Sequence, residues 1–89
     1  MSDRVEKIRL AIEASLSPAS LEIIDQSHRH AGHAGARDGR GHFDVQIVSD
    51  TFKGKLPLAR HRLVFAAVGN LMETDIHALS IKALTPDEI

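Results

Sequence analysis

The segment from residue 42 to residue 49 alternates between apolar and polar side chains, and this pattern constrains the fold more than any other feature. Phe43, Val45 and Ile47 are apolar, and Asp44 and Gln46 between them are polar. Successive side chains of a β-strand point to opposite faces, so the alternation predicts a strand with one buried face. Such a strand needs neighbouring strands and a layer that covers its apolar face.

Two further segments are typical of strands. Residues 21–25 are short and rich in isoleucine, and residues 77–84 alternate again, with Leu79 and Ile81 on one face. Residues 28–41 read HRHAGHAGARDGRG; they are rich in glycine and contain no large apolar residue, which favours a mobile surface loop. The strands on either side of this loop are therefore predicted to form an extended antiparallel hairpin.

Helices are predicted between and around these strands. Val5, Ile8, Ile12 and Leu16 form an apolar stripe at helical spacing, and Pro18 follows it. Residues 50–55 resemble a short helical turn that is broken at a glycine, and a proline at position 57 suits the first turn of a helix that we expect to reach about residue 72. A threonine and a proline at positions 85 and 86 predict a short terminal helix.

The predicted order is α-β-β-α-α-β-α. We expect an α+β fold of two layers, with helices on one face of a three-stranded sheet. Residues 1–89 are predicted to form a single domain, because compact domains usually contain about 50 to 250 residues.

Composition excludes several classes of function. The chain contains no cysteine, which excludes disulfides, thiol catalysis and a thiolate metal site. No GxSxG motif occurs, and no serine has a persuasive histidine and aspartate context, so we expect no enzymatic activity. No apolar run approaches the roughly 20 residues of a membrane span. The N-terminal residues lack a secretory apolar stretch, which predicts a cytoplasmic protein.

Three motifs together carry a resemblance to a known family. The run VSDTFKGKLPLARHRLVF is followed by IHALSI and then by TP near the end of the chain. With the preceding strand, loop and HF segment, this pattern resembles the BolA-like family over nearly the whole length. The resemblance implies a fold similar to the type II KH domain and a protein that is not an enzyme.

The resemblance also implies a partner protein and a metal cluster that the two chains share. Members of this family pair with monothiol glutaredoxins and share a [2Fe-2S] cluster, with glutathione as a further ligand. The histidine of the HAL motif, here His77, would be one cluster ligand, and by position His30 of the loop would be the second, with His33 as the alternative. This implies a monomer when the chain is alone and a heterodimer with its partner.

The residues alone leave other interpretations open for these histidines. His77 opens a predicted strand, where the residues alone favour a hydrogen-bonded structural role over a ligand role. The loop histidines could equally belong to a polar loop or bind zinc, which imidazole nitrogens suit. His42 opens the second strand and is interpreted as structural.

A rival interpretation is a DNA-binding regulator of stress response and cell morphology, which the resemblance also implies. Residues 51–72 contain no acidic side chain, and this window could contact the phosphates of duplex DNA. The candidate contact residues are Lys53, Gly54, Lys55, Arg60 and Arg62. KH domains clamp nucleic acid with a GxxG loop, whereas the matching stretch here has a single glycine. The chain also lacks tyrosine and tryptophan, on which readers of single strands stack bases.

Overall fold

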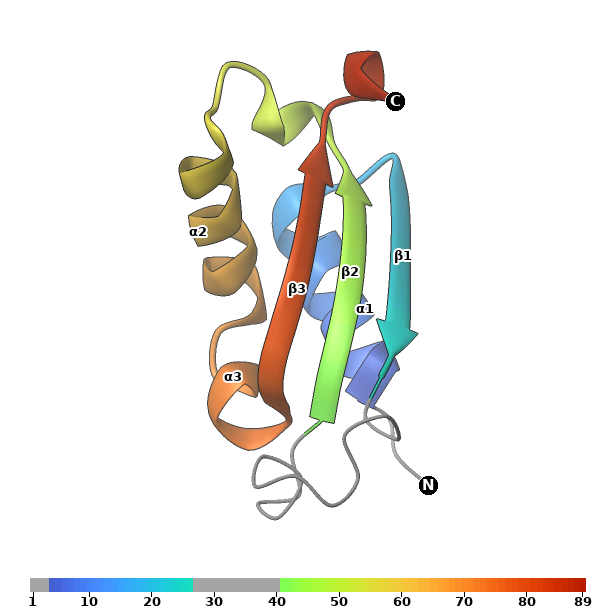
Figure 1. Ribbon diagram of the computed structural model, residues 1–89, viewed down its shortest axis with the longest axis vertical. Coiled ribbons are helices and arrows are strands. Elements are labelled where there is room, and N and C mark those ends of the chain that lie inside the picture. Colours follow the sequence, from blue (N-terminus) through green and yellow to red (C-terminus); the bar gives the residue numbers. More distant parts are fainter. Residues whose placement is uncertain (1–3, 27–40) are drawn as a thin grey trace.

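The computed structural model describes residues 4–26 and 41–89 (Figure 1). The helices and strands follow one another in the predicted order, with one additional short helix. In chain order they are α1 (Arg4–Leu16), β1 (Ser20–Asp25), β2 (Gly41–Val48), the 3-10 turn η3 (Asp50–Phe52), α2 (Pro57–Val68), α3 (Leu71–Thr74), β3 (Ile76–Leu84) and the 3-10 turn η4 (Pro86–Glu88).

The three strands form one sheet in the order β1-β2-β3. β1 pairs with β2 in antiparallel fashion, so the predicted hairpin is confirmed, and β3 runs parallel to β2. A parallel neighbour requires a long crossover connection, which η3, α2 and α3 supply. Figure 1 shows α1 passing behind the strands and α2 running alongside β3.

One face of the sheet packs against the helices, which confirms the two-layer prediction. The apolar residues of β2 that alternate in the sequence are buried, and α1 contributes the predicted stripe. The buried core consists of Ile8, Ile12, Leu16, Phe43, Val45, Ile47, Phe52, Val64, Val68 and Ile76. Side chains of the opposite parity on β2, such as Asp44 and Gln46, lie on the uncovered face.

The prediction that the helix beginning at Pro57 reaches Met72 is wrong. α2 ends at Val68, and Gly69 follows with a φ of 51° and a ψ of −125°, a conformation that favours glycine. The N–H of Gly69 donates to the carbonyl of Phe65 and closes the helix. Residues after it form the separate single turn α3. Periodicity continued through Gly69, and the glycine itself was the signal for the break.

A buried serine joins the end of α1 to the end of β2. Ser49 is 1% exposed, and its Oγ donates to the carbonyl of Leu16 at 2.6 Å. The same oxygen accepts from the N–H of Thr51 at 3.1 Å and so caps η3. Thr51 Oγ1 donates to the Leu16 carbonyl as well, at 3.2 Å. The first residue after α1, Ser17, has a φ of 43°, which is unusual for a residue with a side chain.

Candidate functional site

His77 lies at a β-bulge near the start of β3, and its side chain is exposed. The consecutive β2 residues Gly41 and His42 pair in register with Ile76 and Ala78, so His77 is the extra residue on β3. Bulges of this kind redirect side chains and occur often beside functional sites.

The bulge decides which way His77 points. Ile76 is buried in the core, and Leu79 packs against the core. In a regular strand, residue 77 would lie on the same face as Leu79 and would therefore point toward the core. The additional residue allows both His77 and Ala78 to be exposed between two core residues. The sequence predicted an accessible histidine at a strand end, and the bulge is the device that makes it accessible.

A second histidine lies beside His77. The ring centroids of His42 and His77 are 5.2 Å apart, with an interplanar angle of 45°. His42 is half-buried on β2, and its Nε2 atom is buried. Sequence reasoning treated the two histidines separately, because nothing in the sequence indicates that β2 and β3 are adjacent in this register.

An ionic cluster fixes the chain just before His77. Asp75 is 7% exposed, and its Oδ2 lies 3.3 Å from Lys7 Nζ and 3.6 Å from Arg4 Nε. A hydrogen bond from Thr74, together with the charges of Lys7 and Arg4, lowers the pKa of Asp75 although burial opposes the shift. The Asp75 carbonyl also accepts from the N–H of Gly41 at 2.9 Å. α1, β2 and the start of β3 are thereby joined directly beside the bulge.

The loop histidines of the sequence prediction, His30 and its alternative His33, lie outside the described residues. Their role as ligands stays a prediction. Within residues 4–26 and 41–89, no group of three or more histidine, cysteine or acidic side chains is arranged to hold a metal ion. The described part of the chain can therefore contribute an imidazole to a site but does not complete one.

Four of the five predicted DNA-contact residues are exposed. Three of them, Lys53, Gly54 and Lys55, lie between η3 and α2, and Arg62 lies in α2 itself. Gly54 has a φ of 74°, which favours glycine there, and Lys53 lies 3.4 Å from Asp50 in an exposed ion pair. Exposed pairs of this type are weak and leave the lysine accessible.

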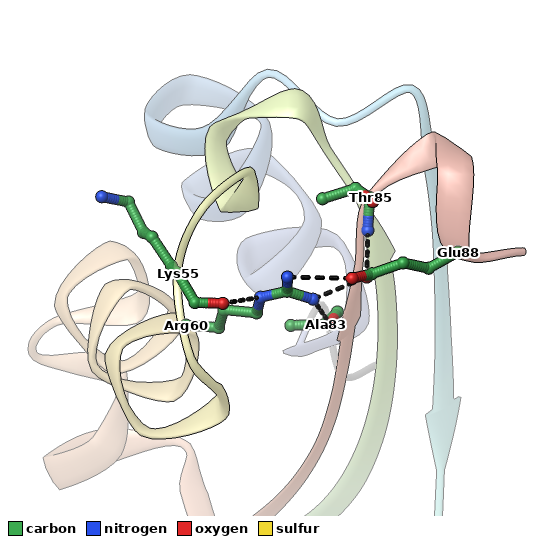
Figure 2. Close-up of polar contacts among 5 residues, drawn as sticks. All are labelled: Lys55, Arg60, Ala83, Thr85 and Glu88. Carbon is green, nitrogen blue, oxygen red and sulfur yellow. Dashed lines mark hydrogen bonds and ion pairs between the residues drawn. The ribbon is translucent and has the colours of Figure 1, made fainter.

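The fifth, Arg60, is engaged within the fold, as Figure 2 shows. Its Nη1 and Nη2 atoms donate to the Glu88 carboxylate at 2.6 and 3.0 Å. Nη1 also donates to the Ala83 carbonyl at 3.0 Å, and Nε donates to the Lys55 carbonyl at 2.8 Å (Figure 2). The Arg60 hydrogen bond, reinforced by one from the Thr85 N–H, lowers the pKa of Glu88 to about 2. A bidentate pair of this kind holds the planar guanidinium in a fixed orientation.

The uncovered face of the sheet carries a shallow groove that the sequence analysis missed. All three strands contribute to its lining, which consists of Glu22, Ile24, Asp44, Val45, Gln46, Ser80, Ile81 and Lys82. The two-layer prediction left this face open and the alternation placed polar side chains on it, but neither indicated a groove there. His42 shares the parity of Asp44 and Gln46 on β2, so the histidine pair lies at one end of the same face.

Known proteins of one kind match this chain. The family described as BolA-like protein matches residues 12–88. SufE-like protein 1 of Arabidopsis thaliana is 43% identical over 94 residues, which span 100% of this chain and 25% of that protein. Protein BOLA1 of the same plant, named as chloroplastic, is 41% identical over 91 residues, 99% of this chain and 57% of BOLA1. The chain thus spans less than two thirds of the length of these relatives.

A bacterial relative and a solved structure extend the comparison. The DNA-binding transcriptional regulator BolA of Escherichia coli (strain K12) is 36% identical over 83 residues, 93% of this chain and 76% of the regulator. The structure of the BolA domain of SufE1 from Arabidopsis thaliana superimposes with a TM-score of 0.87 at 41% identity, and covers 100% of this chain and 99% of that domain. No helix among the described residues is long and apolar enough to cross a membrane.

Proposed function

Since the chain belongs to the BolA-like family, we propose that it is a non-enzymatic partner of a monothiol glutaredoxin. In this role it completes a shared [2Fe-2S] cluster for iron–sulfur cluster trafficking or iron sensing. The observation that carries the proposal is the exposed imidazole of His77. A β-bulge directs it away from the core, beside the ionic cluster of Asp75, which is called the Asp75 anchor below. An accessible imidazole on an anchored strand is what a shared cluster requires of this chain.

The donor set of the chain fits this division of ligands. Iron–sulfur clusters are usually held by thiolates, and in Rieske centres two histidines replace two cysteines on one iron. This chain has six histidines and no cysteine. His77 would supply one imidazole, and His30, or alternatively His33, the second. The thiolates would come from the glutaredoxin cysteine and glutathione, so the chain alone carries no cluster and is a monomer that becomes a heterodimer.

The test mixes the chain with a cluster-loaded monothiol glutaredoxin and records visible absorption and circular dichroism. Wild-type protein is expected to change the cluster spectrum, and His77→Ala is expected to remove that change. His61→Ala is the matched control, because His61 is a half-buried histidine on α2. His30→Ala and His33→Ala identify the loop ligand. Spectra of the His77→Ala mixture that match the wild-type mixture would show that His77 is not a ligand.

A second candidate is a DNA-binding regulator, because the Escherichia coli relative is named as one. Because Arg60 is bound to Glu88, the contacts would come from the three exposed cations Lys53, Lys55 and Arg62. Counterion release then gives a log–log salt slope of about −2.7, against about −3.6 if Arg60 also reached a phosphate. Fluorescence anisotropy with duplex DNA at several salt concentrations measures this slope. An affinity that does not depend on salt would exclude this function.

The cellular location remains a prediction. The sequence predicts the cytoplasm, whereas the names of two relatives place them in chloroplasts or mitochondria. Imaging of the tagged full-length protein in its own cells would decide between these compartments.

A further inference from the structure

The two histidines at the bulge differ in how deeply they are buried. His42 is half-buried, and its Nε2 atom is buried, whereas the His77 side chain is exposed. An exposed side chain can populate several staggered rotamers, but only some of them would direct an imidazole nitrogen toward a partner. A fixed neighbour that favours one rotamer would therefore prepare His77 for binding.

The contact between the rings has the geometry of such a neighbour. Their centroids lie 5.2 Å apart in a tilted arrangement, which falls within the 4.5–7 Å range typical of packed aromatic pairs. The bulge brings the rings together, because it adds His77 to β3 next to the register pair of His42 and Ala78. The Asp75 anchor holds the backbone immediately before it. The backbone anchor and the contact with the His42 ring thus both restrict the His77 side chain.

We propose that His42 is a positioning residue for His77: its ring restricts the His77 imidazole to the rotamer that meets a metal-bearing partner. The consequence for cluster binding rests on the proposed function, whereas the restriction of the rotamer does not. We assign His42 a role through its ring because its Nε2 is buried and so is not available to a partner's metal. A phenylalanine, which keeps a flat ring and has no nitrogen, should therefore replace it.

The first test uses the chain alone. Three-bond couplings measured by NMR give the χ1 populations of His77 in wild type, His42→Phe, His42→Ala and the control His61→Ala. One dominant rotamer is expected in wild type, in the phenylalanine variant and in the control, and averaged populations are expected in His42→Ala. Amide spectra confirm that β2 and β3 remain paired in each variant. A His77 that stays in one rotamer in a folded His42→Ala variant would overturn the proposal.

The second test measures binding to the cluster-loaded glutaredoxin by circular dichroism. Release of His77 from one staggered well into at most three predicts that His42→Ala needs up to about a threefold higher concentration for the half-maximal change. His42→Phe should bind like wild type. If His42→Phe loses the spectrum as His77→Ala does, His42 is itself a ligand and the positioning role is wrong. If wild type gives no spectral change, the proposed function fails, while the rotamer measurement still decides the role of His42.

Discussion

Replacement of Ser49 by alanine should destabilise the protein by about 2 kcal/mol, because two net hydrogen bonds of about 1 kcal/mol each are lost. The Oγ atom is buried, donates to the Leu16 carbonyl at 2.6 Å and accepts from the Thr51 N–H at 3.1 Å. The Leu16 carbonyl keeps the hydroxyl of Thr51 as a donor at 3.2 Å, which limits the loss. The alanine side chain offers the Thr51 N–H no hydrogen-bond acceptor.

Thr51→Val provides the matched comparison. It removes only the longer bond to Leu16 and should cost about 0.5 kcal/mol, at the low end for a hydrogen bond. The double variant Ser49→Ala, Thr51→Val removes both hydroxyl donors to the Leu16 carbonyl. Its destabilisation should exceed the sum of the single effects by about 1 kcal/mol, since groups that share a partner are coupled.

Urea denaturation followed by far-ultraviolet circular dichroism measures these differences, because the chain has no tryptophan or tyrosine. With a slope of about 1 kcal/mol/M, the Ser49→Ala midpoint should fall by about 2 M. Ser80→Ala, an exposed serine on the uncovered sheet face, should change stability by less than about 0.5 kcal/mol. A Ser49→Ala loss equal to that of Ser80→Ala, with unchanged slopes, would refute the reasoning about the buried hydroxyl.

Three further predictions concern stability. Ser17→Gly should stabilise the protein by about 0.5–1 kcal/mol in the same urea assay, because Ser17 has a φ of 43° that glycine adopts without strain. Gly69→Ala should destabilise it by about 1 kcal/mol, because Gly69 has a positive φ of 51° that disfavours a side chain. The added Cβ would meet only an ordinary contact at 3.7 Å, so a neutral effect would contradict the argument from the backbone conformation. The pKa of Glu88 is lowered from 4.5 to about 2, so the stability that its ionised carboxylate contributes is complete above pH 4.5 and is lost as the pH falls toward 2. The difference in stability between wild type and Glu88→Gln should therefore shrink over that window, and a constant difference would argue against the Arg60 pair.

The sequence was sufficient wherever a local pattern determined the structure. The alternation around Val45 placed a core strand, and the stripe ending at Leu16 placed α1, because burial of one face follows directly from period two or period 3.6. The terminal turn was predicted from Thr85 and Pro86, and it forms as η4, with a capping box between Thr85 and Glu88. These features depend on residues close together in the chain.

The features that were missed depend on residues far apart in the chain. The engagement of Arg60 with Glu88 joins α2 to η4 across 28 positions, and the Lys7 to Asp75 contact spans 68. The bulge at His77 is likewise a property of the register between β2 and β3 and not of either strand alone. The resemblance of the HAL motif identified His77 as a candidate, but only the sheet explains why it faces outward beside His42.

The two candidate functions use opposite ends of β3. His77 lies at its beginning, whereas the turn that carries Lys53 and Lys55 is held near its end through the contact of Arg60 with the carbonyl of Ala83 (Figures 1 and 2). With a rise of about 3.3 Å per residue, the six positions from 77 to 83 separate these ends by about 20 Å. This exceeds the Debye length of about 8 Å at physiological salt, so charges at one end are screened from the other. Charge reversal at Lys53 and Lys55 should therefore abolish any DNA binding without altering the cluster spectra, and His77→Ala should do the reverse.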